Sequence, residues 1–191
     1  MYPKLPELIK YLKSLEATKS IFLVTNGQEP DMIQKLQDED ALPTQLYLST
    51  NAADYESFIK INKPKYDDSW ERWNRTLDML KDLDTRTVLR ITLIRNYNDQ
   101  KEMIPAFAEM FRKASPHFIE IKSYMHIGRS TNRLEHENML EMEEVKKFSE
   151  QIAKESKIFS IMDESLVSRI SILQNNERFI DRWIPTYANT N

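Results

Sequence analysis

Apolar positions alternate between helical and strand spacing along the whole chain. Leu5, Leu8, Ile9 and Leu12 repeat with a helical period, and the next apolar run, at 21–24, is continuous, as in a strand buried on both faces. Repetition of this alternation is typical of βα units. The predicted strands are 21–24, 45–49, 87–94, 118–122, 158–161 and 166–173, and the predicted helices are 5–15, 32–36, 51–61, one of about four turns after Asp68, 99–114, and one from Asn138 through Ser156.

Two of these helices carry a capping pattern. Asp68 is followed three positions later by Glu71, and Asn138 by Glu141, which predicts a capping box at each helix start. The segment 123–137 has no clear period and is longer than most βα loops. A loop of that length often marks a functional element.

The pattern predicts the α/β class, with mostly parallel strands joined by helical crossovers, in an open sheet or in part of a (β/α) barrel. No internal repeat or low-complexity linker divides the chain, so one domain is expected. In both architectures ligands meet the carboxyl ends of the strands. The corresponding positions are 25–27, 49–51, 95–96 and 122–124, all polar or charged. This suits a site for a polar ligand, although polar residues are also ordinary in loops.

Composition removes several function classes. Among 191 residues there is no cysteine, which excludes disulfides, thiolate-bound zinc, a cysteine nucleophile and an iron–sulfur cluster held by the chain's own thiolates. Two glycines are too few for a P-loop or a dinucleotide-binding glycine motif. The three histidines lack the spacing of a zinc site. The net charge of -3 means that any polyanion must be bound by a local patch.

No apolar run approaches the roughly 20 residues that span a bilayer, and the N-terminus lacks the apolar stretch of a signal peptide. We therefore expect a cytoplasmic protein with no membrane partner.

Two side chains at predicted strands have a specific chemical use. Arg90 lies within a strand pattern, where a buried guanidinium needs a partner: a ligand carboxylate or an internal glutamate. Lys122 closes a strand and is a candidate catalytic residue, because a lysine can form a Schiff base with a ketoacid. An ordinary strand-end lysine is the alternative.

Several segments, read in order, resemble the archaeal tRNA 4-demethylwyosine synthases, which are radical SAM enzymes of wybutosine biosynthesis. These segments are 22–27 (FLVTNG), 45–49 (QLYLS), 70–72 (WER), 90–93 (RITL) and 118–130 (FIEIKSYMHIGRS). The resemblance extends over nearly the whole chain, and 118–130 is its most specific part.

This resemblance implies a partial (β/α) barrel of the radical SAM type that binds S-adenosylmethionine and a [4Fe–4S] cluster. The implied reaction condenses pyruvate-derived carbons onto N1-methylguanosine at position 37 of tRNA(Phe). Residues 1–137 would form the partial barrel, and 138–191 a segment resembling the wyosine-base-formation region, packed on the same domain. The family's cluster-binding Cys-x-x-x-Cys-x-x-Cys loop and its preceding strand have no counterpart here.

Met1-Tyr2-Pro3 looks like the residues just after the family's Gly-Glu-Pro motif. The N-terminal βα units, with the family's pyruvate-binding lysine, would then be missing, as in an expressed fragment or a mis-started reading frame, and the chain alone would be inactive. Asn51 stands where the family is expected to have aspartate, and Leu140 where proline is expected.

The resemblance also implies which residues carry the function. The cofactor-binding residues would be Thr25, Asn26, Ser49, Asn51, Arg90 and Thr92, which could hydrogen-bond the ribose and carboxylate of S-adenosylmethionine. The tRNA-binding residues would be Arg95, Lys101, Arg129, Arg133, Arg178 and Arg182, although acidic neighbours could instead hold these cations in surface ion pairs. No metal ligand is expected in this chain.

Two other functions stay open. The missing cysteines favour a non-catalytic α/β module that binds RNA or a partner protein. A cluster-free enzyme that uses Lys122 with a ketoacid is the other alternative. An incomplete barrel would also expose strand edges, which predicts self-association.

Overall fold

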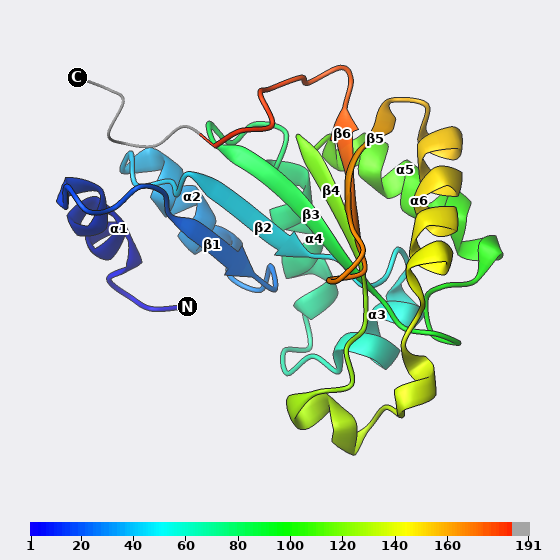
Figure 1. Ribbon diagram of the computed structural model, residues 1–191. Coiled ribbons are helices and arrows are strands. Elements are labelled where there is room, and N and C mark those ends of the chain that lie inside the picture. The colour runs from blue at the N-terminus through cyan, green and yellow to red at the C-terminus, as the bar shows by residue number, and fades with distance from the viewer. Residues whose placement is uncertain (185–191) are drawn as a thin grey trace.

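A six-stranded mixed sheet organises the computed structural model, in which residues 1–184 are described (Figure 1). The strands are β1 (Phe22–Thr25), β2 (Gln45–Ser49), β3 (Arg86–Leu93), β4 (Phe118–Ser123), β5 (Phe159–Ser165) and β6 (Ile170–Asn175). Their order in the sheet is β1-β2-β3-β4-β6-β5. Strands β1 to β4 are parallel, whereas β6 is antiparallel to both β4 and β5. The predicted α/β class is confirmed, while the partial barrel and the missing N-terminal units stay predictions.

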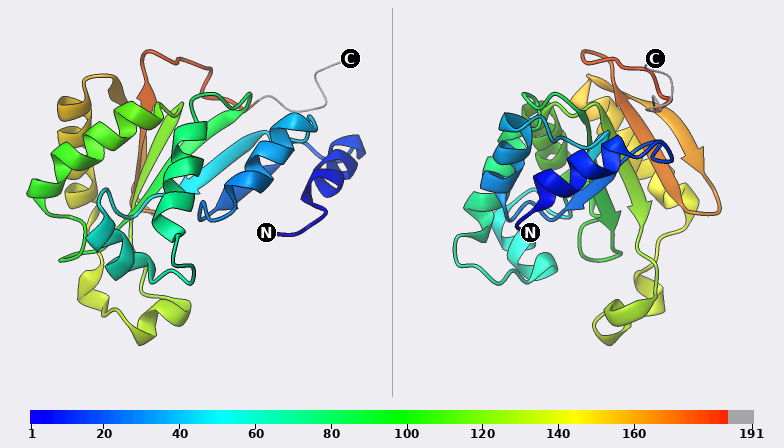
Figure 2. Two further views of the ribbon diagram at one scale, coloured as in Figure 1. Left: turned by 180° about the vertical axis from the view of Figure 1, so that it is seen from behind. Right: turned by 90° about the vertical axis from the view of Figure 1, so that its left-hand side faces the viewer.

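Helices α2, α4, α5 and α6 pack on one face of the sheet (Figure 2). The α-helices are α1 (Leu5–Ser14), α2 (Pro30–Asp38), α3 (Tyr55–Asn62), α4 (Ser69–Met79), α5 (Ile104–Ala114) and α6 (Met142–Ser156), and the 3-10 helices are η1 (Lys101–Met103), η2 (Gly128–Asn132) and η3 (His136–Asn138). None of the helices within residues 1–184 is long and apolar enough to cross a membrane.

The core lies between these helices and the alternate strand residues that face them. Leu48, Leu89 and Ile121 are fully buried against helix residues such as Trp73 and Phe107. Because side chains alternate across a strand, the residues between them face the other side of the sheet. We call this second side the open face. Along it lie Phe22, Val24, Tyr47, Arg90, Glu120 and Ile172, with Phe22 and Val24 about half exposed.

A second, smaller apolar cluster supports the long loop between β4 and α6. Tyr124 and Leu134 from this loop pack against Ile94 at the end of β3, with Ile61 of α3 alongside. The loop extends beyond the carboxyl ends of the strands, next to α3 (Figure 1). The segment predicted to lack a period therefore holds η2 and η3 and its own small core.

Both predicted capping boxes are wrong. Asp68 does precede α4, but its carboxylate accepts a hydrogen bond from Arg72 and makes no side-chain cap. Asn138 belongs to η3, and the box at α6 is formed by Glu141 and Glu144.

The predicted strand 166–173 is also misplaced. The β5–β6 turn holds Leu166 and Val167, which are 71% and 95% exposed, and Arg169 adopts a φ of 50° there. The strand itself is Ile170–Asn175.

Candidate functional site

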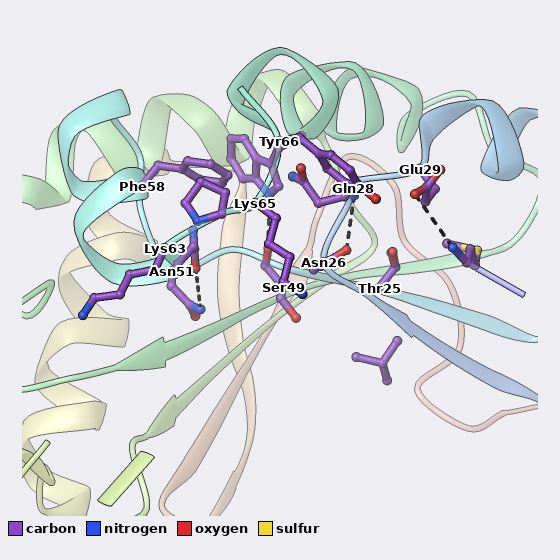
Figure 3. Close-up of a pocket in the computed structure, with 15 residues that line it drawn as sticks. Thr25, Asn26, Gln28, Glu29, Ser49, Asn51, Phe58, Lys63, Lys65 and Tyr66 are labelled. Carbon is purple, nitrogen blue, oxygen red and sulfur yellow. Dashed lines mark hydrogen bonds and ion pairs between the residues drawn. The ribbon is translucent and has the colours of Figure 1, made fainter. Parts of the chain in front are cut away.

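A cavity of about 770 Å³ lies at the carboxyl ends of β1 and β2. Its other walls come from α3, α4 and the connection between them. Figure 3 shows the strand-end side chains Thr25, Asn26 and Ser49 beside Lys65 and Tyr66 of that connection. Four of the six predicted cofactor residues line the cavity: Thr25, Asn26, Ser49 and Asn51. The edge of the sheet predicted to bind a ligand thus carries this cavity, which we call the large cavity.

The turn after β1 is held by its own side chains. Thr25 Oγ1 accepts a hydrogen bond from the Gly27 N–H at 3.1 Å, and Asn26 Oδ1 accepts one from the Gln28 N–H at 3.3 Å. Gly27 has a φ of 75°, in the left-handed region that favours glycine. Thr76 of α4 donates to the Gly27 carbonyl oxygen at 2.8 Å. These bonds fix the backbone that forms one wall of the cavity.

Gln28 is a lining residue that the sequence reasoning missed. Its side chain is buried, and Nε2 donates to the Ser69 carbonyl oxygen at 3.0 Å. Its Oε1 is buried without a hydrogen-bond partner among residues 1–184. A buried amide oxygen without a partner is costly unless a ligand donor reaches it. In the sequence, only its position directly after the strand end Thr25-Asn26-Gly27 could have identified Gln28 as a lining residue.

Aromatic rings form the second part of the lining. Trp73 donates its Nε1–H to the Ser49 carbonyl oxygen at 3.1 Å, and its ring lies 5.7 Å from that of Phe58. Tyr66 lies under the guanidinium of Arg72, at 4.7 Å from the ring centroid. The same guanidinium hydrogen-bonds Asp68 and thereby lowers the pKa of that carboxyl. Rings and amides in one cavity suit a ligand with a flat heterocycle and polar substituents.

Asn51 connects this cavity to β3. Its Oδ1 accepts a hydrogen bond from the Thr92 N–H at 3.0 Å, and its carbonyl oxygen accepts one from Asn98 Nδ2 at 2.9 Å. Its Nδ2 donates to Asn62 Oδ1 at 3.3 Å. The amide at position 51 therefore fixes the strand ends as well as facing the cavity.

Arg90 and Thr92 lie on the open face and do not line the cavity. The Arg90 guanidinium donates to both carboxylate oxygens of Glu120, at 2.7 and 3.3 Å, and stacks 4.2 Å from the centroid of the Tyr47 ring. Burial, together with the Glu120 charge, raises the pKa of the Tyr47 hydroxyl. The internal glutamate considered as a partner for Arg90 is thus present.

Lys122 lies on the same face, opposite Thr92 on β3 and Ile170 on β6. Its side chain is half-buried and makes no ion pair within residues 1–184. Lys122 therefore stays a candidate catalytic residue.

The cations predicted to bind tRNA divide into two groups. Arg95 forms a double hydrogen bond with Glu144, which lowers the pKa of that carboxyl, and it also donates to the Met139 carbonyl oxygen. Arg182 pairs with Asp163, and Arg178 donates to the Ser115 carbonyl oxygen. Lys101, Arg129 and Arg133 are exposed and have no ion pair in the described part of the chain. Arg133 borders a second, smaller cavity.

Within residues 1–184 no group of three or more His, Cys, Asp and Glu side chains is placed to hold a metal ion.

The chain is similar to known proteins in its family pattern, its sequence and its fold. A family model described as wyosine base formation matches residues 113–175. The chain is 42% identical, over 95% of its length, to the S-adenosyl-L-methionine-dependent tRNA 4-demethylwyosine synthase of Methanocaldococcus jannaschii, and it covers 54% of that protein. The corresponding enzyme of Pyrococcus abyssi is 36% identical over 93% of the chain, with 51% of that protein covered.

Solved structures agree with these sequence matches. A structure described as TYW1 with a lysine–pyruvate adduct bound has a TM-score of 0.81 and 41% identity, with 94% of this chain and 54% of that chain covered. A crystal structure of archaeal TYW1 has a TM-score of 0.74 and 37% identity over the same shares of the two chains. The chain spans about half the length of these relatives and corresponds to a C-terminal portion.

Proposed function

The chain belongs to the tRNA 4-demethylwyosine synthase family, and we propose that it holds S-adenosylmethionine and faces the tRNA in such an enzyme. The proposed reaction of the whole enzyme condenses pyruvate-derived carbons onto N1-methylguanosine at position 37 of tRNA(Phe). The names of the relatives support the tRNA substrate and the dependence on S-adenosylmethionine. The chemistry of the large cavity is the structural support.

The unpartnered Oε1 of Gln28 carries the proposal. S-adenosylmethionine offers an adenine amino group, ribose hydroxyls and an ammonium group, each of which can donate a hydrogen bond to this oxygen. Lys63 and Lys65 line the same cavity and can attract the cofactor's carboxylate. Phe58, Tyr66 and Trp73 provide rings for the adenine. The residues present therefore fit the cofactor.

The [4Fe–4S] cluster does not fit this chain. Such clusters are held by cysteine thiolates, and the chain has none. No catalytic step through a cluster is therefore assigned to these residues, and we expect the chain alone to be inactive.

Lys122 is the proposed candidate in this chain for contact with pyruvate. Support for Lys122 comes from its half-buried amine on the open face, which has no ion pair within residues 1–184. A lysine in such a place can attack a ketone carbonyl.

Binding of S-adenosylmethionine by isothermal titration calorimetry tests the proposal. The Ser49→Phe variant places a ring in the cavity, and we expect its affinity to be at least tenfold lower than that of the unmodified chain. Ser14→Phe, on an exposed residue at the end of α1, is the matched control and should bind as the unmodified chain does. Absence of binding by the unmodified chain, or equal affinity of the two variants, would contradict a cofactor site in this cavity.

The absence of cysteine favours a second candidate function, a non-catalytic module that binds RNA or a partner protein. Titration with S-adenosylmethionine and, separately, with tRNA distinguishes these two functions. A chain that binds tRNA but takes up no S-adenosylmethionine would support the module instead of the enzyme portion.

A further inference from the structure

We propose that a small cavity between α3 and the loop after β4 binds one nucleotide of the substrate RNA, next to the nucleotide whose base reaches the cofactor proposed for the large cavity. This inference rests on the proposed function and deepens it. The cavity has a volume of about 200 Å³. Its floor is apolar, from Ile61, Ile94 and Leu134, with Tyr97 beside them, and its rim includes Lys63 and Arg133. We call it the rim pocket.

The charges at the rim pocket have no acidic partner among residues 1–184. Lys60, Lys63 and Arg133 line it together, and none of them forms an ion pair with another residue of 1–184. The ammonium of Lys60 lies 5.1 Å from the centroid of the Tyr97 ring. Cations at the end of α3 are favoured by the helix dipole, which accounts for Lys60 and Lys63. The helix dipole does not account for Arg133, which comes from the loop after β4 and also lines the rim pocket.

This arrangement has the chemistry of a site for a nucleotide in single-stranded RNA. Such sites combine cations for the phosphate with an aromatic ring for the base, because unpaired bases stack on aromatic side chains. Ligand pockets for larger molecules have volumes of about 300–1,000 Å³, so the rim pocket has room for a small group only. One base on the Tyr97 side, with its phosphate among the three cations, matches both its size and its charge.

The rim pocket is next to the large cavity. Lys63 lines both cavities. An enzyme that acts on a base must take that base out of its stack. When one base is extruded towards the cofactor proposed for the large cavity, the neighbouring nucleotide is left at the edge of that cavity, next to the rim pocket.

Binding of fluorescently labelled tRNA(Phe), followed by anisotropy over a range of salt concentrations, tests the inference. The triple variant Lys60→Ala, Lys63→Ala and Arg133→Ala should lower the affinity and reduce the slope of log K against log salt by about 0.7–0.9, because the three cations together neutralise one phosphate. The control replaces Lys19, Lys147 and Lys154 by alanine. These exposed cations do not line the rim pocket, and their loss changes the net charge equally. This control variant should leave the slope of log K against log salt unchanged.

The stacking contact has its own test. Tyr97→Ala should weaken binding by about fivefold or more at fixed salt, whereas Tyr97→Phe keeps the ring and should bind nearly as the unmodified chain does. Equal urea midpoints of the two variants, measured by circular dichroism, would show that the loss is not one of folding.

Equal slopes for the two triple variants would overturn the rim pocket, and so would a lack of tRNA binding by the unmodified chain. In either case, retained binding of S-adenosylmethionine would leave the proposed function standing. Loss of both ligands would overturn both proposals.

Discussion

Replacement of Gly27 by alanine should destabilise the protein through both backbone strain and overpacking. A Cβ at this position would lie 2.8 Å from Leu48 Cδ1 and 3.0 Å from Trp73 Cδ1, with the backbone at a φ of 75°. The left-handed conformation costs a residue with a Cβ about 1–2 kcal/mol, and overpacking costs about 1–3 kcal/mol. Lower entropy of the unfolded chain offsets about 0.4–1 kcal/mol of this. The expected net loss in the free energy of unfolding is about 1–4.6 kcal/mol.

Gly128→Ala is the matched control, since the structure has a second glycine in the same backbone region. Gly128 has a φ of 63°, and an added Cβ would have no atom within 4 Å. Only the backbone cost applies there, so urea unfolding followed by circular dichroism should show Gly27→Ala to be less stable than Gly128→Ala by about 1–3 kcal/mol. Equal losses would refute the packing argument.

A double variant tests the cause of this difference. Leu48→Val removes the Cδ1 atom that lies closest to the added Cβ. The losses of Gly27→Ala and Leu48→Val should then be less than additive, because residues in contact couple energetically.

Four further predictions follow from particular contacts. Glu120→Gln should lower the free energy of unfolding by about 1–3 kcal/mol in urea titrations, because it leaves the half-buried Arg90 without its charged partner; no change would show that the pair is solvated. Burial, with Arg178 and Arg86 nearby, lowers the pKa of His117 to about 4, so the unfolded chain binds more protons between pH 6.5 and 4. Stability should therefore fall as the pH falls through that window, and His117→Gln should have a smaller pH dependence there. Borohydride reduction with pyruvate should label Lys122, as seen by peptide mass analysis, and Lys122→Arg should remove that label; labelling elsewhere would end this assignment. Strand β1 is an edge strand of the sheet and its Phe22 and Val24 are about half exposed, which predicts self-association by strand pairing; a monodisperse monomer in light scattering would contradict it.

Elements with strong local signals could be predicted from the sequence. The strand Gln45–Ser49 has the predicted bounds, and the strand before Thr25-Asn26-Gly27 is displaced by one residue. Continuous apolar runs bounded by turn residues are the pattern of buried parallel strands. The position of the large cavity followed from the same strands, because ligands bind at the carboxyl ends of parallel strands.

Features that depend on distant residues could not be predicted in this way. Glu120 is the partner of Arg90 because β3 and β4 pair in one particular register, which no local pattern reveals. Asp68 has a capping sequence, but the guanidinium of Arg72 competes for its carboxylate. Val167 is β-branched and fits a strand pattern, yet it lies in a turn where it is almost fully exposed.

The sheet order also constrains how the protein forms during synthesis. Strand β6 is the last strand of the chain, yet it lies between β4 and β5. Strand β5 therefore reaches the sheet only through β6, and β4 keeps an open edge until residues 170–175 have left the ribosome. During that interval one edge of β4 is unpaired in the nascent chain, and such an edge is an aggregation hazard. A released, truncated chain that ends before residue 170 should consequently engage chaperones more strongly than one that ends after residue 175.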